Sequence, residues 1–345
     1  MKIFFSSHHN PHFPTITEYI EIAILNLGHD LVIFEDRQHI FPGRMRKGLP
    51  LLNQLDQRVI NRKMLALAEE AKPDIAIIAG GHRISSETIK ILKDQGVVCI
   101  LWTIDAPLFF QPIIDVAPFY DHIFCQGTEA IELLAGAGIR GAQWLPMACE
   151  PEYHYPGDCS IADKEKYGSD VVFVGSYYPD RADLFERISA FDLAIWGPGW
   201  DGLDRNSSLR RCIRGSHTTP DEWLKIYSAS KIIIATHYHD PQNRFPVYQA
   251  SPRVFEAMAC GCFVISDRQR DVFSLFEEGK HLVGFDNPND LIEKIKYYLA
   301  HPEEREAIAR RGREEVLKNH TYVDRIKKLI FLVTKPSCPV GRYEA

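Results

Sequence analysis

The stretch that decides the fold reads SPRVFEAMACGCFVIS and covers residues 251–266. Ser251 is a favourable N-cap, and Pro252 suits the first position of a helix, where its missing N–H costs nothing. Gly261 can take the left-handed conformation that ends a helix. The apolar run that follows indicates a buried strand over 262–265. The stretch therefore predicts a short helix followed by a strand of a parallel sheet.

The same helix carries groups suited to a nucleotide. Its first turn has unpaired N–H groups and a partial positive charge, so the backbone from Ser251 to Val254 is a candidate diphosphate site. Arg253 adds a bidentate phosphate donor. Glu256 follows on the same helical face, where a carboxylate can accept both hydroxyls of a ribose. The alternative is an ordinary helix–strand unit with a surface arginine and a surface glutamate.

The bulk composition limits the class of protein. The chain has 345 residues, is 45% hydrophobic and carries a formal net charge of −6, which argues against a nucleic-acid binder. No apolar run is long enough to span a membrane, and the N-terminus is too short in its apolar part for a signal peptide. The eight cysteines are scattered without a C-x-x-C pair. We therefore expect reduced thiols and a cytoplasmic protein.

Strand-like and helix-like segments alternate in both halves of the chain. This alternation predicts an α/β fold with two Rossmann-like domains, whose parallel sheets face an interdomain cleft. The expected parts are an N-terminal domain at 1–150, a linker at 151–168, a C-terminal domain at 169–318, a helix at 319–335 that crosses back to the N-terminal domain, and a tail at 336–345.

Glycines mark two further positions in the second half. Gly175-Ser176 ends a predicted strand, where a residue without a side chain lets the backbone approach a phosphate; the alternative is a plain turn. Residues 197–202 formally match G-x-G-x-x-G, but no helical period opens within them, so a dinucleotide fingerprint is rejected. Trp200 in this segment either stacks near a nucleotide base or belongs to the core.

Polar residues also follow two predicted strands of the first half. His8 and His9 follow the first strand, and Asp105 follows a later one. Carboxyl ends of parallel strands share one edge, so all three should face the cleft, where a general base would act if the enzyme inverts. The alternative is a capping aspartate and loop histidines. The spacing of His237 and His239 resembles a metal site, but no carboxylate or cysteine partner is in convincing register.

Several motifs together resemble one family. They are VFVGS at 172–176 with Arg181 following, IWGPGW at 195–200, the 251–261 helix with its strand, HPEER at 301–305, and HTY at 320–322 with Arg325. In this order they are similar to GT-B glycosyltransferases, and more narrowly to the CgeB/YkvP-like group of spore proteins. The first half, from WTIDAP at 102–107 to WLP at 144–146, matches more loosely.

The resemblance implies a sugar-nucleotide donor in the C-terminal domain, an acceptor in the N-terminal one, and catalysis without a metal. Retaining enzymes of the wider fold often carry two glutamates eight positions apart, the second matching Glu256. The first falls on Tyr248 here, so the contact to the sugar and the stereochemical outcome stay open.

We therefore expect a hexosyltransferase-like enzyme that uses a nucleoside-diphosphate sugar, most plausibly a UDP-sugar, and needs no further cofactor. The acceptor is a glycan, a protein or a small molecule, with no nucleic acid and no membrane span involved. Two alternatives stay open, a UDP-sugar epimerase of the same fold and a non-catalytic protein that binds nucleotide sugars. The expected donor-site residues are Gly175, Ser176, Arg181, Trp200, Tyr248, Ser251, Arg253, Val254 and Glu256, and the candidate catalytic residues are Asp105, His9 and His8.

Overall fold

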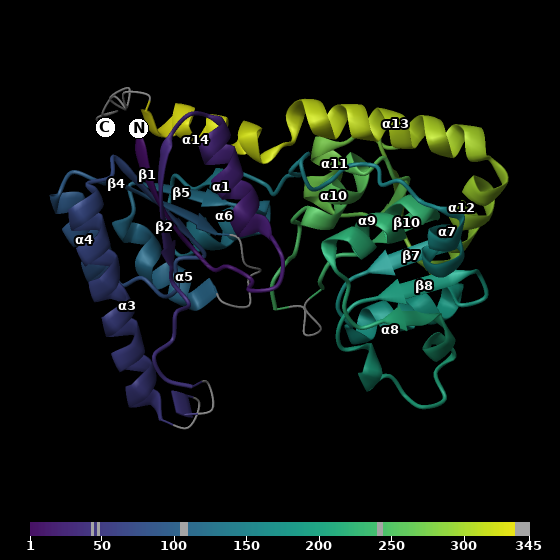
Figure 1. The fold of residues 1–345 in the computed structure, drawn as a ribbon, viewed down its shortest axis with the longest axis horizontal. Coiled ribbons are helices and arrows are strands. Elements are labelled where there is room, and N and C mark those ends of the chain that lie inside the picture. Colours follow the sequence, from purple (N-terminus) through teal and green to yellow (C-terminus); the bar gives the residue numbers. More distant parts are fainter. Residues whose placement is uncertain (43–44, 47–48, 104–109, 240–243, 335–345) are drawn as a thin grey trace.

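Two six-stranded parallel sheets form the protein in the computed structural model, which describes residues 1–42, 45–46, 49–103, 110–239 and 244–334 (Figure 1). We call the part built on the first sheet the N-terminal lobe and the part built on the second the C-terminal lobe. The α/β fold predicted from the alternating pattern is confirmed.

The N-terminal lobe has strands in the order β2-β1-β3-β4-β5-β6. Its strands are β1 (Lys2–Ser7), β2 (Asp30–Glu35), β3 (Ile75–Ala79), β4 (Val98–Thr103), β5 (His122–Cys125) and β6 (Gln143–Trp144). Its helices are α1 (Ile16–Asn26), α3 (Pro50–Ala71), α4 (Ser86–Asp94), α5 (Phe110–Val116), the 3₁₀ turn η2 (Ala117–Phe119) and α6 (Thr128–Gly136).

Alternating side chains of a strand enter two different cores in this lobe. Ile3 and Phe5 of β1 pack into one hydrophobic cluster, whereas Phe4 packs into another, and all three are fully buried. Successive side chains of a strand point to opposite faces, so both faces of the sheet are covered. This explains why the strands read as continuous apolar runs in the sequence.

The C-terminal lobe has strands in the order β12-β11-β10-β7-β8-β9. Its strands are β7 (Ser169–Val174), β8 (Leu193–Trp196), β9 (Ile213–Gly215), β10 (Ser230–Ala235), β11 (Val264–Asp267) and β12 (Val283–Phe285). Its helices are α7 (Ile161–Tyr167), α8 (Pro179–Ile188), the 3₁₀ turns η3 (Trp200–Gly202) and η4 (Ser208–Cys212), α9 (Pro220–Ala229), α10 (Pro252–Ala259), α11 (Arg270–Leu275), α12 (Pro288–Ala300) and α13 (Pro302–Asn319).

The last helix, α14 (Tyr322–Thr334), returns to the N-terminal lobe and packs against α1 (Figure 1). Arg325 anchors it, because its guanidinium donates hydrogen bonds to the carbonyl oxygens of Pro146 (2.9 Å) and Met147 (3.1 Å). Arg325 is 6% exposed, and burial lowers its pKa to about 10. These buried hydrogen bonds tie α14 to the segment that joins the lobes.

Two element boundaries differ from the sequence-based expectation. The strand expected at 262–265 begins two residues later, at Val264. The chain first completes the left-handed turn at Gly261 (φ 76°), and the next two residues lead from this turn into the sheet. The apolar spacing of Val59, Ile60, Leu65 and Leu67 predicts a helix that begins at Asp56, but the helix begins at Pro50 instead. Asp56 is fully buried and accepts hydrogen bonds from the backbone of Ile40 (2.7 Å) and from His39 Nδ1 (2.6 Å), so it anchors the preceding loop.

Candidate active site

The topology of the C-terminal lobe marks one point of its sheet as a ligand site. The strand order reverses between the adjacent strands β7 and β10, and in doubly wound sheets ligands bind outside the carboxyl ends of the strands at such a switch point. Gly175 and Ser176 follow β7 there, and Thr236 and His237 follow β10. The pair Gly175-Ser176, predicted from sequence, therefore lies at the switch point.

Helix α10 begins at this edge, and a buried network fixes its N-terminus. Ser251 is the N-cap, and its hydroxyl accepts a hydrogen bond from the backbone of Arg253 (3.4 Å). The Ser251 N–H donates to His237 Nε2 (2.9 Å), and His237 Nδ1 contacts Asp267 Oδ1 at 2.5 Å. An accepting Nε2 carries no proton, so Nδ1 is the protonated nitrogen and donates to Asp267.

Asp267 completes this network at the end of β11. Burial alone would raise the pKa of its carboxyl, but contacts with His237 and a hydrogen bond from His239 hold that pKa far below its usual range. The two histidines that resembled metal ligands thus share a carboxylate from another strand. Asp240, which follows them, lies outside the described residues.

Arg253 joins the ends of the two switch-point strands. Its Nε donates to the carbonyl oxygen of Val174 (2.7 Å), and its Nη1 donates to that of Thr236 (3.1 Å). A Cβ added at Gly175 would lie 2.5 Å from Arg253 Nη2, so the glycine lets the guanidinium approach. The structure thereby brings together Gly175 and Arg253, which the sequence predicted from separate segments.

Arg181, also predicted to contact the donor, supports the same turn from behind. Its Nη1 donates to the Ser176 carbonyl oxygen (2.9 Å) and its Nη2 to that of Thr236 (3.2 Å). The side chain is buried, and burial, with a smaller effect of Arg253, lowers its pKa to about 10. Arg181 therefore acts as a strut between two strand ends in this structure.

Trp200 corrects one sequence-based interpretation. Its ring is 1% exposed and packs against Phe173 and Phe185, and its Nε1 donates to the Gly175 carbonyl oxygen (2.9 Å). No face of the ring is available for a nucleotide base, so the core alternative holds. The tryptophan contributes by fixing the Gly175 turn.

Glu256 lies in a pocket between the two lobes. The cavity has a volume of about 330 Å³ and is bounded by α1 and the residues before it, the 153–154 segment, the start of α9 and the start of α10. The Glu256 side chain is 20% exposed. Burial raises the pKa of its carboxyl to about 7, with Arg253 opposing the shift. An ionisable group with so perturbed a pKa in a cleft is typical of a functional site.

His154 lies next to this carboxyl. Its Nδ1 accepts a hydrogen bond from the Glu150 backbone N–H (2.9 Å), and its Nε2 lies 3.9 Å from Glu256 Oε1. Burial lowers the pKa of His154 to about 3, so the ring is neutral. Because Nδ1 is the acceptor, the proton is on Nε2 and faces Glu256.

Aromatic rings form the walls of the same pocket. Tyr19 packs on His154 with ring centroids 4.9 Å apart and on Tyr153 at 5.2 Å, and His154 packs on Trp223 at 5.4 Å. These four residues were absent from the sequence-based site. Tyr19 lies on the buried face of a helix, and Trp223 follows an ordinary capping box, so their local sequence patterns indicate only structure.

The candidate residues of the N-terminal lobe form a separate cluster. His9 contacts Glu21 through Nε2 (2.7 Å) and Glu35 through Nδ1 (3.0 Å). Burial would lower the pKa of His9, but the hydrogen bonds to the two glutamates raise that pKa overall. A raised pKa favours a charged His9 that links Glu21 and Glu35 over a neutral His9 that acts as a base. His8 is exposed and contacts Glu35 through Nδ1 only (3.1 Å). Asp105 lies outside the described residues.

Tyr248 lies at the contact between the lobes. Its backbone N–H donates to Glu129 Oε2 (3.2 Å), and the Arg270 guanidinium lies 3.9 Å from the centre of its ring. It does not line the pocket that holds Glu256. Val254, another predicted donor-site residue, has a buried side chain and can contribute to a site only through its backbone.

The described residues form no helix that is long and apolar enough to cross a membrane. They also contain no group of three or more His, Cys, Asp or Glu side chains arranged to hold a metal ion.

Comparisons with known proteins agree with this geometry. Residues 181–330, which include Arg181, α10 and α14, match the family model described as "Glycosyl transferase-like". The chain has the GT-B fold. It is similar over 96% of its length, at 14% identity and a TM-score of 0.67, to sucrose-phosphate synthase from Thermosynechococcus elongatus, of which it covers 98%.

Two further relatives extend the likeness across both lobes. Anabaena HepE, in complex with UDP-glucose, is similar to 97% of this GT-B chain, with 100% of HepE covered, at 12% identity and a TM-score of 0.65. The spore protein CgeB of Bacillus subtilis (strain 168) is 21% identical over 272 residues, which cover 76% of this chain and 83% of CgeB. The resemblance predicted from the sequence motifs is thus confirmed.

Proposed function

We propose that this chain transfers a hexosyl group from a UDP-sugar to a hydroxyl group of an acceptor held by the N-terminal lobe, without a metal cofactor. The observation that carries the proposal is the position of α10, which brings Arg253 to the switch point of the sheet and Glu256 to the interlobe pocket. The complex of HepE with UDP-glucose supports the choice of nucleotide.

In this proposal the diphosphate lies against the Gly175–Ser176 turn, Arg253 and the first turn of α10. During transfer, the bond between the anomeric carbon and a diphosphate oxygen breaks, and negative charge grows on that oxygen. A fixed guanidinium and a helix N-terminus placed there stabilise the transition state more than the ground state. In this proposal, positive charge from the protein stabilises the leaving diphosphate, as a metal ion does at other diphosphate sites.

The nucleoside occupies the interlobe pocket. The Glu256 carboxylate accepts hydrogen bonds from both ribose hydroxyls, and the neutral ring of His154 lies beside it, with Nε2 3.9 Å from Oε1. The aromatic rings of the pocket offer an apolar wall for the base. Because the pocket is lined by both lobes, a bound donor also holds the lobes together and excludes water from the reacting centre.

The acceptor oxygen forms the new bond to the anomeric carbon and loses its proton. For an inverting reaction a general base in the N-terminal lobe takes this proton. Of the predicted candidates, His8 suits this role better than His9, because among the described residues only one ring nitrogen of His8 makes a hydrogen bond, whereas both ring nitrogens of His9 do. Asp105 stays a second candidate.

Thermal shift and product analysis test the proposal. UDP and a UDP-sugar should raise the melting temperature of the wild type in the presence of EDTA. A ligand at a hundred times its dissociation constant stabilises a fold by about 2.7 kcal/mol. Arg253→Ala and Glu256→Ala should abolish most of the shift and the transfer, whereas the exposed controls Arg310→Ala and Glu293→Ala should retain both.

Three results would contradict the proposal. Full activity in Arg253→Ala and Glu256→Ala would exclude this site. Conversion of the donor to an isomeric sugar nucleotide without any acceptor would identify an epimerase, and tight donor binding without turnover would identify a binding protein.

A further inference from the structure

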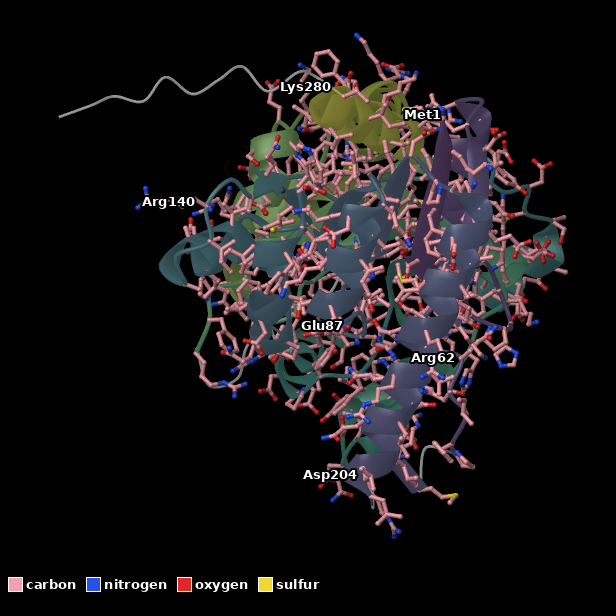
Figure 2. All side chains as sticks on the ribbon, turned by 90° about the vertical axis from the view of Figure 1, so that its left-hand side faces the viewer. Met1, Arg62, Glu87, Arg140, Asp204 and Lys280 are labelled. Atoms are coloured by element: carbon pink, nitrogen blue, oxygen red, sulfur yellow. The ribbon has the colours of Figure 1, made fainter. Side chains whose placement is uncertain are left out.

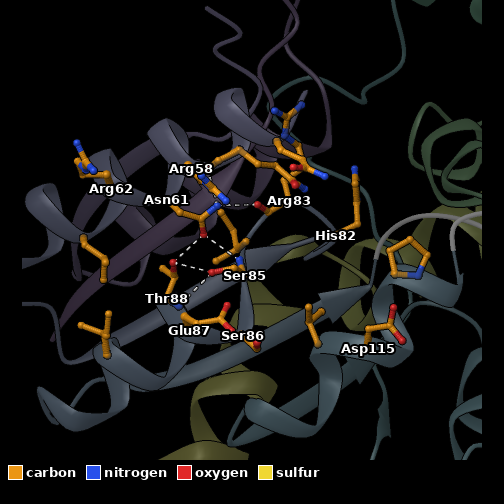
Figure 3. A pocket seen from close by; sticks show the side chains of 17 residues that line it. Arg58, Asn61, Arg62, His82, Arg83, Ser85, Ser86, Glu87, Thr88 and Asp115 are labelled. Atoms are coloured by element: carbon orange, nitrogen blue, oxygen red, sulfur yellow. Dashed lines mark hydrogen bonds between the residues drawn. The ribbon is translucent and has the colours of Figure 1, made fainter. Parts of the chain in front are cut away.

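A second and larger cavity lies wholly in the N-terminal lobe. Its volume is about 770 Å³, and it is bounded by α3, the loop that follows β3, the start of α4 and the end of α5 (Figure 3). None of its lining residues belongs to the pocket that holds Glu256. Its volume falls in the range of small-molecule binding sites.

The wall of this cavity is fixed by one buried amide. Asn61 of α3 donates from Nδ2 to the carbonyl oxygens of Gln57 (2.8 Å) and Arg83 (3.0 Å), and its Oδ1 accepts from the Ser85 N–H (2.8 Å) and the Thr88 hydroxyl (2.7 Å). The side chain is 7% exposed, and all its donors and acceptors are used. The loop after β3 is therefore held in place against α3 before any ligand binds.

Three arginines from two elements line this cavity. Arg58 and Arg62 are one turn apart on α3 and both are exposed (Figure 3). Neither guanidinium makes a hydrogen bond or an ion pair with another described residue. Two guanidinium groups without counter-ions on adjacent turns repel each other, and a bound anion relieves that repulsion.

Arg83 of the loop is the third arginine. Its Nη1 lies 2.9 Å from His39 Nε2 and its Nη2 lies 3.8 Å from the buried Asp56 carboxylate, whereas its Nε is buried and has no hydrogen-bond partner among the described residues. A buried donor without a partner is costly in a folded protein and requires an explanation. The acidic side chains that line the cavity are Glu87 and Asp115, and Arg83 is ion-paired with Asp56 behind it, so Arg58 and Arg62 are the lining arginines without an ion pair to another described residue.

The geometry points to a binding site for an acidic carbohydrate, a sugar or oligosaccharide that bears carboxylate or phosphate groups. The arginines would hold the anionic groups, and hydroxyl groups of Ser85 and Ser86 line the same cavity. The cavity begins at the loop after β3, and β3 pairs with β1, whose end carries His8. A carbohydrate held there can present a hydroxyl at the edge of the sheet that carries the candidate base. That this carbohydrate is the acceptor of the transfer rests on the proposed function, whereas its binding to the cavity does not.

Calorimetric titration with three probes at two salt concentrations tests this inference. Trigalacturonate carries carboxylates, glucose 6-phosphate carries a phosphate, and maltotriose is neutral. At least one acidic probe should bind more tightly than maltotriose and lose affinity as salt rises, and the preferred probe identifies the anionic group. Arg58→Ala/Arg62→Ala should weaken its binding by about tenfold or more.

The matched control is Arg140→Ala/Arg310→Ala, which removes two exposed arginines elsewhere. Figure 2 shows Arg140 projecting from an edge of the N-terminal lobe, away from Arg62 on α3. This control should leave binding of the acidic probe unchanged. The inference is overturned if no acidic probe binds, if maltotriose binds equally well, or if both double variants weaken binding equally.

A parallel titration with UDP-glucose separates this inference from the proposed function. Arg58 and Arg62 lie outside the interlobe pocket that holds Glu256, so the Arg58→Ala/Arg62→Ala variant should bind UDP-glucose as the wild type does. Failure of UDP-glucose to bind any form would count against the proposed function alone, while loss of acidic-probe binding in the α3 variant would still support an acidic-carbohydrate site.

Discussion

At the scale of single residues, the carboxyl of Glu256 is poised between two charge states near neutral pH, because burial raises its pKa to about 7. Only the carboxylate form accepts hydrogen bonds on both oxygens without donating one. UDP-glucose, which does not itself titrate in this range, should therefore bind about tenfold more tightly at pH 8 than at pH 6, following the ionised fraction. Glu256→Gln should bind it weakly and without this pH dependence, as measured by calorimetry. A wild-type affinity that is flat over this range would contradict the assignment.

The same carboxyl should cost the protein stability. Its pKa is about 7 in the fold and 4.5 in the unfolded chain, so between these values the folded state binds more protons. Its contribution to the free energy of unfolding therefore falls as pH rises from 4.5 to 7. Glu256→Gln should be more stable than the wild type at pH 8 and not at pH 4.5, as measured by urea denaturation. The exposed Glu293→Gln should show no such difference between the two pH values.

At the scale of elements, the turn at Gly175 can pack against α10 only because residue 175 has no side chain. A Cβ at position 175 would lie 2.5 Å from Arg253 Nη2 and 2.9 Å from the ring of Phe173. Gly175→Ala should therefore displace the arginine from the strand ends, destabilise the fold by about 1–3 kcal/mol and weaken UDP-glucose binding. Denaturation and calorimetry measure the two effects. Gly202→Ala, with open space around its Cβ, is the matched control and should change neither.

Helix α10 also shows how far sequence reasoning extends. Ser251, Pro252 and Gly261 act on their own neighbours, so the start and end of the helix could be predicted from a single stretch. The sequence places Trp200 among the expected donor-site residues, with the core as the alternative, because a tryptophan after a glycine turn has the same local pattern whether its ring faces the core or a cleft. Only the tertiary packing, with its hydrogen bond to the Gly175 carbonyl oxygen, decides between the two.

The interlobe pocket is harder to predict for the same reason. Tyr19, His154 and Trp223 come from α1, the segment between the lobes and α9, and they meet only because the two lobes are docked. The sequence could identify one wall, the α10 helix with Glu256, since its motif is local. The opposite wall depends on the relative placement of two sheets, about which no local pattern carries information.

At the scale of the whole molecule, residues of both lobes form a latch beside Tyr248. Helix α6 has Gly127 at its N-cap, which offers no side chain to the first N–H groups. Asp271 of the C-terminal lobe caps the helix instead, because its carboxylate accepts hydrogen bonds from the Thr128 N–H (2.8 Å) and hydroxyl (2.6 Å). Arg270 adds an ion pair to Glu132 (2.8 Å), so one lobe caps a helix of the other.

Loss of this cap should open the two lobes. Asp271→Ala removes an N-cap worth about 0.5–2 kcal/mol, and the cap exists only while the lobes are docked, so the open form should gain in population. Its radius of gyration from small-angle X-ray scattering should increase, and its affinity for UDP-glucose should fall, because the pocket needs walls from both lobes. Asp163→Ala is the control, since Asp163 accepts from the Ser160 N–H in the capping box of α7 and pairs with Lys225 within one lobe. It should lower stability without changing the radius. Equal radii for the wild type and Asp271→Ala, with UDP-glucose affinity retained, would show that the packing of α14 on α1 holds the lobes together without the latch.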